Sequence, residues 1–319
     1  MPETLAAEPP EALPAERFDH FMARANAAYY ATHDFSADFC TAPELTQVFG
    51  ELLGAWAKTV WQMTGAPETA ILAEAGPGRG VLMGDALRAW PGANVHFIET
   101  SPRLRAEQQS RVPQATWHDS LATLPKGPMI LLANEFLDAL PVRQFIRREA
   151  GWMERFVESG SYVEQPTDRA LPDAPVDSIR EVNEAALEFC TALAARDAVA
   201  LFIDYGPMQS GPGGSVQAIK SGKYADPLAE PGTADITAHV DFSAIAAIAN
   251  TQGPVKQNAF LTALGLFQRS DMLARKHPDK ADNLRLAAQR LTAPEAMGSL
   301  FKVLALCPKD FPRLPGFEI

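Results

Sequence analysis

The feature that most constrains this fold is a glycine-rich turn between an apolar segment and a helical one. Residues 70–75 have the length and apolarity of a buried strand, the sequence Gly-Pro-Gly-Arg-Gly follows at 76–80, and residues 81–90 have helical periodicity. A strand, a tight turn and a helix in this order form the first part of a crossover between parallel strands. The chain is therefore predicted to contain a parallel sheet that is covered by helices.

The alternation of strands and helices continues along the chain. Further strands are predicted at residues 94–99, 115–117, 129–133, 198–203 and 299–306, and further helices at 102–112 and 176–196. Residues 142–148 and 151–159 alternate in the way that the two strands of a hairpin do. This order of elements predicts an α/β fold with a doubly wound, mostly parallel sheet and helices on both faces.

The segments that flank this alternation predict helical additions. Residues 16–32 have helical character, and Thr41 and Glu44 form a capping box that begins a helix running to about residue 63. Residues 206–240 are rich in glycine and proline and are expected to form a loop, with helices at 241–250, 257–275 and 279–291. We therefore divide the chain into a disordered tail at 1–15, an N-terminal helical segment of the substrate cleft at 16–66, and a main domain at 67–319 whose insertions are the loop 206–240 and the helices 241–291.

Charge and cysteine content argue against several classes of function. The 319 residues include 28 Lys and Arg against 39 Asp and Glu, and this net charge of −11 gives no general attraction to nucleic acid or to anionic membranes. The three cysteines lie far apart and the six histidines lack metal-ligand spacing, so we expect reduced thiols and no metal site. We find no apolar run long enough to insert in a membrane and no targeting signal, and we expect a cytoplasmic protein.

The glycine turn has the spacing of a particular kind of cofactor site. Val81 stands where the dinucleotide fingerprint requires a glycine, which disfavours an NAD-dependent oxidoreductase. The turn instead places Gly76, Gly78 and Gly80 at alternate positions after Glu74. This arrangement suits S-adenosyl-L-methionine (SAM), which has no pyrophosphate but carries a cationic methionine head and a sulfonium. We predict that these three glycines and Glu74 bind the cofactor.

Polar side chains at the ends of later strands extend the predicted site. Glu99 ends the next strand, where a carboxylate would accept hydrogen bonds from ribose hydroxyls, and Asp119 follows the third strand, where it either binds the adenine amino group or forms an ordinary turn. Asn134, Glu135 and Asp138 follow the fourth strand and should point toward the methyl donor. The two carboxylates could hold a planar guanidinium, or they could cap a short helix.

Several segments together resemble a known family. They are YY at 29–30, DFCTAPE at 38–44, FGELLG at 49–54, EAGPGRG at 74–80, LM at 82–83, NEFLDALP with VRQF at 134–145, DYG at 204–206, PG at 231–232, DITAHVDF at 235–242 and MGSLFKVLA at 297–305. In these segments the chain resembles the MidA-like SAM-dependent methyltransferases, which include the mitochondrial complex I assembly-factor protein arginine methyltransferase. The matches extend from about residue 29 to the C-terminus.

The resemblance implies a fold, a cofactor and an acceptor. The implied fold is the class I, Rossmann-like SAM-dependent methyltransferase fold, and the implied reaction is methylation of an arginine in a protein substrate, a subunit of respiratory complex I. Symmetric ω-N-dimethylarginine is the product expected of the mitochondrial member. Glu44 lies in one of the matching segments and is a candidate catalytic residue beside Glu135 and Asp138.

Two other functions are compatible with the sequence. The first is a SAM-binding complex I assembly chaperone, for which contact with a partner matters and methyl transfer does not; the long segment at 206–235 and the added helices would supply the contact surface. The second is a methyltransferase that acts on a small molecule. The sequence leaves the acceptor residue, the degree of methylation and the oligomeric state open.

Overall fold

The centre of the molecule is a seven-stranded sheet, seen in a computed structural model that describes residues 14–33 and 41–318. Its strands are β2 (Ile71–Ala75), β3 (Val95–Ile98), β4 (Thr116–His118), β5 (Met129–Asn134), β10 (Ala198–Tyr205), β14 (Thr251–Lys256) and β15 (Phe301–Leu306). They lie in the order β14-β15-β10-β5-β2-β3-β4. The five strands from β10 to β4 are parallel, whereas β15 runs antiparallel to both of its neighbours. The chain order reverses between β2 and β5, where ligands bind in sheets of this kind.

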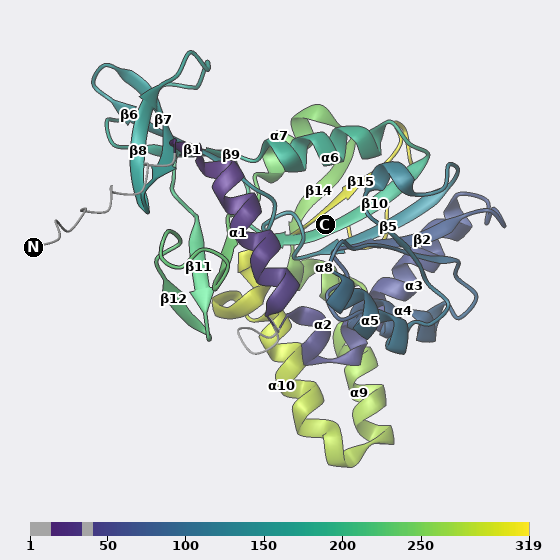
Figure 1. The fold of residues 1–319 in the computed structure, drawn as a ribbon. Helices are drawn as coiled ribbons and strands as arrows, with labels where there is room; N and C mark the ends of the chain where they lie inside the picture. The colour runs from purple at the N-terminus through teal and green to yellow at the C-terminus, as the bar shows by residue number, and fades with distance from the viewer. Residues whose placement is uncertain (1–13, 34–40, 319) are drawn as a thin grey trace, which may run out of the picture.

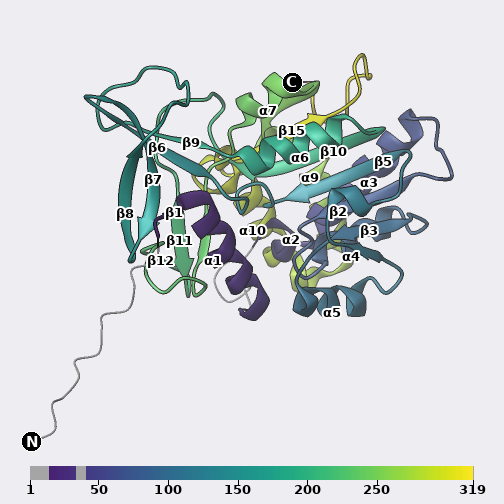
Figure 2. The same cartoon turned by 45° about the horizontal axis from the view of Figure 1, so that its top comes forward.

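Helices cover both faces of this sheet (Figures 1 and 2). One apolar core joins the sheet to α3 (Gln47–Met63) and α4 (Val81–Ala89) and includes the fully buried Trp56 and Phe97. The other core joins the opposite face to α6 (Glu184–Ala194) and α7 (Phe242–Ile248) and includes Phe202 and Phe242. Helix α5 (Pro102–Arg111) follows β3. The predicted doubly wound α/β fold is thereby confirmed.

Two smaller sheets lie beside the central one. The first is antiparallel and pairs β1 (Glu16–Arg17), β7 (Gly151–Glu158), β6 (Arg143–Arg148) and β9 (Ile179–Val182) in this order, with β8 (Ser161–Pro166) also on β7. The second has the order β12 (Lys223–Ala225), β11 (Gln217–Lys220) and β13 (Asp235–Thr237). Helix α1 (Phe18–Thr32) packs against both, because Phe18 and Met22 share a core with Val157, Ala218 and Ile236. Both views place α1 between these sheets and the large one (Figures 1 and 2).

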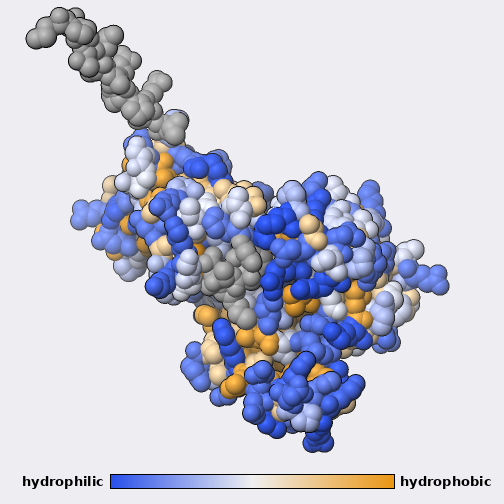
Figure 3. Space-filling model, turned by 60° about the horizontal axis from the view of Figure 1, so that its bottom comes forward, coloured by the Kyte–Doolittle hydropathy of each residue, from blue (hydrophilic) through white to orange (hydrophobic). Residues whose placement is uncertain are grey.

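The C-terminal helices form a projection from the rest of the molecule. After α8 (Gln257–Ala263), α9 (Leu266–Lys276) and α10 (Ala281–Thr292) run side by side away from the central sheet (Figure 1). In the space-filling view, apolar residues gather where this projection joins the rest of the molecule, and the surface around them is mainly hydrophilic (Figure 3). Within the described residues, no helix combines the length and apolarity needed to cross a bilayer.

The predicted elements of the central sheet and the hairpin at 142–159 are confirmed, but four predictions outside it are wrong. The helix at 176–196 is instead β9 followed by α6, because Ile179–Val182 pairs with β6. The loop at 206–240 contains β11, β12 and β13. The helix at 257–275 breaks at Gly265, which has a φ of 89°. The helix from Thr41 is only the four-residue α2 (Ala42–Leu45), and a second cap, the side chain of Thr46, begins α3. The predicted tail and residues 38–40 lie outside the described residues, apart from residues 14–15 of the tail.

Candidate active site

A cavity of about 1070 Å³ opens at the carboxyl ends of β2, β3 and β5. Its wall also includes residues of α1, of α2 and of the three-stranded sheet. Ligand pockets in proteins commonly have about 300–1,000 Å³. The cavity is therefore large enough for a cofactor together with part of a second molecule.

The glycine turn forms one wall of the cavity. Gly76, Gly78 and Gly80 have φ values of 62°, 51° and 75°, in the left-handed region that favours glycine. A Cβ atom on Gly76 would lie 2.8 Å from Cδ2 of Phe136, so the close packing of these two segments requires a glycine there. The Nε2 group of Gln108 donates a hydrogen bond of 2.7 Å to the carbonyl of Gly78 and fixes the turn.

The structure places Glu99 and Asp119 in different environments. The Glu99 carboxylate accepts hydrogen bonds from the Ser101 N–H at 2.7 Å and from Gln108 Nε2 at 3.2 Å, and burial raises its pKa. The Asp119 side chain is 79% exposed at the rim of the cavity and forms an ion pair of 2.6 Å with Arg105. A fixed, half-buried acceptor is therefore present at the Glu99 position, whereas Asp119 is largely in solvent.

Besides Oδ1 of Asp138, two buried acceptor atoms in the cavity wall have no hydrogen-bond partner among the described residues. They are Oε2 of Glu74, on β2, and Oδ1 of Asn134, at the end of β5. Glu74 is 3% exposed, and burial raises its pKa to about 8. Leaving buried polar atoms unpaired costs free energy, which a ligand with cationic or N–H donor groups would recover. These residues and the glycine turn therefore fit the methionine part of SAM.

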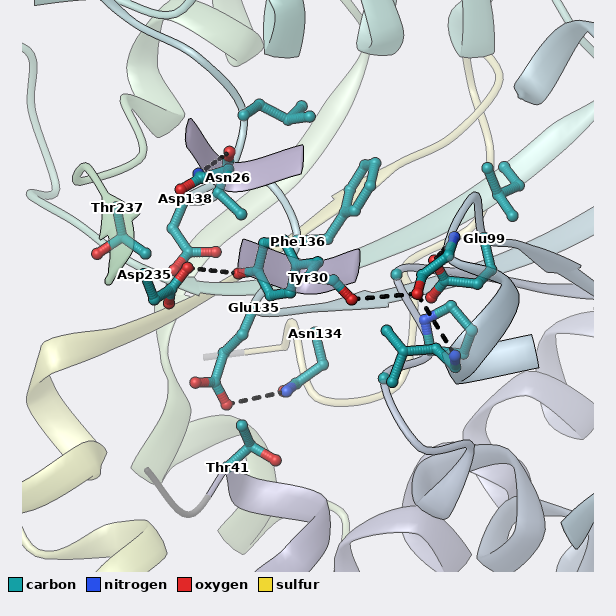
Figure 4. A pocket seen from close by; sticks show the side chains of 18 of the residues that line it. Asn26, Tyr30, Thr41, Glu99, Asn134, Glu135, Phe136, Asp138, Asp235 and Thr237 are labelled. Carbon is teal, nitrogen blue, oxygen red and sulfur yellow. Dashed lines mark hydrogen bonds between the residues drawn. The ribbon is translucent and has the colours of Figure 1, made fainter. Parts of the chain in front are cut away.

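Glu135 and Asp138 bring two carboxylates into the same cavity (Figure 4). Oε1 of Glu135 accepts hydrogen bonds from Asn134 Nδ2 at 3.1 Å and from the Ala42 N–H at 3.4 Å. Oδ2 of Asp138 accepts one of 2.5 Å from the Tyr205 hydroxyl, and Oδ1 is buried without a partner in the described part of the chain. Burial raises the pKa of Glu135 to about 7 and that of Asp138 to about 6.

A buried aspartate holds the turn that carries these two carboxylates. Oδ2 of Asp204 accepts hydrogen bonds from the N–H groups of Phe136, Leu137 and Asp138 at 3.2, 3.0 and 3.2 Å. Glu135 has a φ of 52°, and residues 135–140 form no helix. The alternative interpretation, in which Glu135 and Asp138 cap a short helix, is therefore wrong.

Asp235 and Tyr30 complete the acidic side of the cavity and are not among the site residues predicted from the sequence. Oδ1 of Asp235 accepts a hydrogen bond of 2.6 Å from the Tyr30 hydroxyl, although 205 residues separate the two (Figure 4). The side chain of Asn26, on α1, bonds both the N–H and the C=O of Ile236 and so fixes the neighbouring backbone. The only signal in the sequence was that both residues belong to segments that match the family.

The third candidate catalytic residue, Glu44, is engaged by a cation. Its two carboxylate oxygens accept hydrogen bonds from Nε and Nη2 of Arg79 at 3.1 and 2.8 Å. Thr41 makes no capping hydrogen bond with its side chain, so the predicted capping box is wrong. Because Arg79 belongs to the glycine turn, this pair joins α2 to the cofactor side of the cavity.

Acidic side chains predominate in the cavity wall. Seven carboxylate residues line it, against one arginine and one histidine in the described part of the chain. The carboxylates are Glu44, Glu74, Glu99, Asp119, Glu135, Asp138 and Asp235. Such a wall favours cationic ligands and disfavours anions such as phosphates.

Comparison with known proteins agrees with this geometry. A family model described as "Putative S-adenosyl-L-methionine-dependent methyltransferase" matches residues 52–260, which include the glycine turn and all of the acidic residues except Glu44. The chain belongs to this family. The family's cofactor is SAM, and the protein is accordingly a SAM-dependent methyltransferase.

Relatives with names and solved structures support the assignment to this methyltransferase family. The mitochondrial protein arginine methyltransferase NDUFAF7 homolog of Drosophila melanogaster is 31% identical over 92% of this chain and 81% of its own length. Human NDUFAF7, also named a mitochondrial protein arginine methyltransferase, is 31% identical over 95% and 81%. A "likely methyl transferase" from Burkholderia thailandensis, crystallised with S-adenosyl-homocysteine, has a TM-score of 0.82 at 26% identity and covers 95% of this chain and 90% of its own. The expected class I methyltransferase fold is confirmed.

Proposed function

We propose that this methyltransferase acts on an arginine side chain of a protein, and that the protein is a subunit of respiratory complex I. The observation that carries the proposal is a group of three carboxylates in the cavity that also contains the glycine turn, of which Asp138 and Asp235 are buried and Glu135 is half-buried. A guanidinium is a cation with five N–H donors and is suited to such a group. The relatives are named protein arginine methyltransferases, which supports arginine as the acceptor. The resemblance to a complex I assembly factor supports a complex I subunit as the substrate protein.

The cofactor side of the proposal assigns a role to each predicted residue. Bound SAM supplies a methyl group on a positively charged sulfur, which is already activated for transfer. The unpaired oxygens of Glu74 and Asn134 would accept hydrogen bonds from its ammonium group, and Glu99 would accept those of the ribose hydroxyls. Asp119 would contact the adenine from the rim, where its exposure makes the contact weak.

On the acceptor side, carboxylates bind the guanidinium and orient one nitrogen toward the methyl group. With SAM bound, an in-line transfer would break the methyl–sulfur bond as the nitrogen–carbon bond forms, so the main task of the protein's own residues would be orientation and exclusion of water. A guanidinium has a pKa above 12, so its proton leaves during or after the attack and passes to a carboxylate. Glu135 is suited to receive it, because burial raises its pKa to about 7.

One labelling experiment tests the acceptor class. Purified protein and tritiated SAM are added to extract from a strain that lacks the gene, with Gly78→Asp as the control that removes the cofactor cradle. A labelled protein band that is absent with the variant, and that maps to arginine by mass spectrometry, supports the proposal and identifies the substrate. Label in small molecules alone contradicts it, and tight SAM binding without any label favours the assembly chaperone.

A second experiment tests the role of Glu135. Glu135→Gln keeps the shape of the side chain and removes its charge, and we expect turnover to fall by about a hundredfold with little change in SAM affinity. Glu158→Gln, which makes the same change at an exposed position on β7, is the matched control. Full turnover of Glu135→Gln with unchanged acceptor affinity would remove Glu135 from the mechanism.

A further inference from the structure

The three-stranded sheet turns one of its faces toward the cavity. Cross-strand neighbours in a sheet place their side chains on the same face. Ile219 pairs with Tyr224 on β12 and with Asp235 on β13, while Gln217 pairs with Thr237. All five of these residues line the cavity, so the sheet forms its wall on the side away from the glycine turn.

One row across this face changes steadily in burial and chemistry. Tyr224 is 81% exposed, Ile219 is half-buried, and Asp235 is 3% exposed. The row therefore begins with an aromatic ring in solvent, continues over an apolar side chain and ends at a buried carboxylate. Neighbouring strands lie about 4.8 Å apart, so the two outer Cα atoms are about 10 Å apart.

The apolar and acidic surfaces of this row follow one another in the same order as the parts of an arginine side chain. Arginine has three methylene groups, which pack on apolar surface, and a guanidinium at the end, which binds carboxylates. Exposed tyrosine is among the residues that most often anchor protein contacts. Asp235, at the end of the row, and Glu135, the carboxylate proposed to orient the acceptor, line the same cavity (Figure 4).

The position of each residue in this row is fixed by the fold. The two-residue turn Ser221-Gly222 has φ values of 52° and 70°, as in the tight turns that set hairpin register. At the other end of the row, the Tyr30 hydroxyl bonds Asp235, and Asn26 bonds the backbone of the next residue on β13. A change in register would move Tyr224 to the opposite face.

We propose that the row Tyr224–Ile219–Asp235 is the docking track for the acceptor arginine. The acceptor polypeptide lies across Tyr224 at the mouth, the methylene groups of its arginine pack on Ile219, and the guanidinium reaches Asp235 beside Glu135. Asp235 is then a residue that binds the substrate, and Tyr224 distinguishes an arginine within a polypeptide from a free one. This inference rests on the proposed function, whose acceptor it describes in more detail.

The test measures acceptor binding apart from methyl transfer. Protein loaded with added S-adenosyl-homocysteine is titrated calorimetrically with two probes, Nα-acetylarginine amide and a glycine–serine peptide with one central arginine. Asp235→Asn should weaken both by at least tenfold, because it removes one charge-assisted hydrogen bond. Tyr224→Ala should weaken only the peptide, by about three- to tenfold, and Tyr224→Phe should restore it. Lys223→Ala changes the opposite face of the same hairpin and should affect neither probe.

The outcomes separate this inference from the proposed function. Unchanged binding of both probes by Asp235→Asn, with an unchanged melting temperature, overturns the track. So does equal weakening of the two probes by Tyr224→Ala. If the natural protein binds the arginine probes as described but transfers no methyl group to arginine, the track stands and the proposed function fails. If the natural protein binds neither probe, both fail.

Discussion

Asp204 gives the sharpest test of how the active site is held together. Asp204 is 1% exposed, and its carboxylate accepts four backbone hydrogen bonds. Three come from the turn at 136–138, at 3.0–3.2 Å, and the fourth comes from the Tyr205 N–H at 2.9 Å. Asp204→Ala leaves all four N–H groups without this acceptor, and the turn loses what fixes Glu135 and Asp138.

The magnitude follows from the number of bonds. Each buried N–H left unpaired costs about 1 kcal/mol or more, so Asp204→Ala should lower the free energy of unfolding by about 4 kcal/mol. Unfolding entropy is about 2.1 cal/mol/K per residue, or about 0.67 kcal/mol/K for a chain of this length. The melting temperature should therefore fall by about 6 °C. Asp204→Asn can keep the oxygen that accepts the three bonds from the turn and lose only the bond from Tyr205, so its fall should be about 1.5 °C.

Scanning calorimetry and methyl-transfer assays check this prediction together. Turnover should fall by at least tenfold in Asp204→Ala and by less in Asp204→Asn, because Glu135 and Asp138, which we propose bind the acceptor, move with the turn when its three bonds are lost. Asp197→Ala, an exposed change next to the start of the same strand, is the control. If Asp204→Ala melts within about 1 °C of the natural protein and keeps its turnover, Asp204 does not hold the site.

Three further predictions concern the cofactor side. Burial raises the pKa of Glu74 to about 8. The folded protein therefore keeps a proton that the unfolded chain releases, and its melting temperature without SAM should fall as the pH rises from about 4.5 to 8; a flat profile would contradict this. Gly76→Ala places a Cβ 2.8 Å from Phe136, at a backbone φ of 62° that strains any residue with a side chain. Calorimetry should show that its affinity for SAM is reduced by at least tenfold. Unchanged affinity would mean that the two segments do not pack this closely. Glu44→Gln breaks a partly exposed ion pair with Arg79 and should lower the melting temperature by less than about 2 °C; a larger fall in a thermal melt would mean that the pair supports the fold.

The central sheet could be predicted from sequence because its signals are local. An apolar strand followed at once by the glycine turn and a helix determines where Glu74 and Glu99 lie at the strand ends. The smaller sheets lack such signals. Strands β11, β12 and β13 have three or four residues each, and Ile179–Val182 becomes a strand because β6 is beside it. These strands form because they pair with segments that are distant in the sequence, and such pairing leaves no signal in the local hydrophobic periodicity.

The same distinction divides the active site into two parts. Residues on the cofactor side lie on or directly after strands of the sheet, so a single segment of sequence identifies each of them. The acceptor side depends on contacts between distant segments: Asp204 holds the turn of Glu135, and Tyr30 holds Asp235. Small shifts of β13 would therefore change the shape of the proposed acceptor wall, whereas α1 is also joined to the cofactor side through the hydrogen bond from Ser101 to the Tyr30 carbonyl. A cofactor site carried by the central sheet, with a proposed acceptor wall carried by a separate small sheet, allows one fold to serve different acceptors. Asp235 and Tyr224 are the positions at which such a difference should be sought.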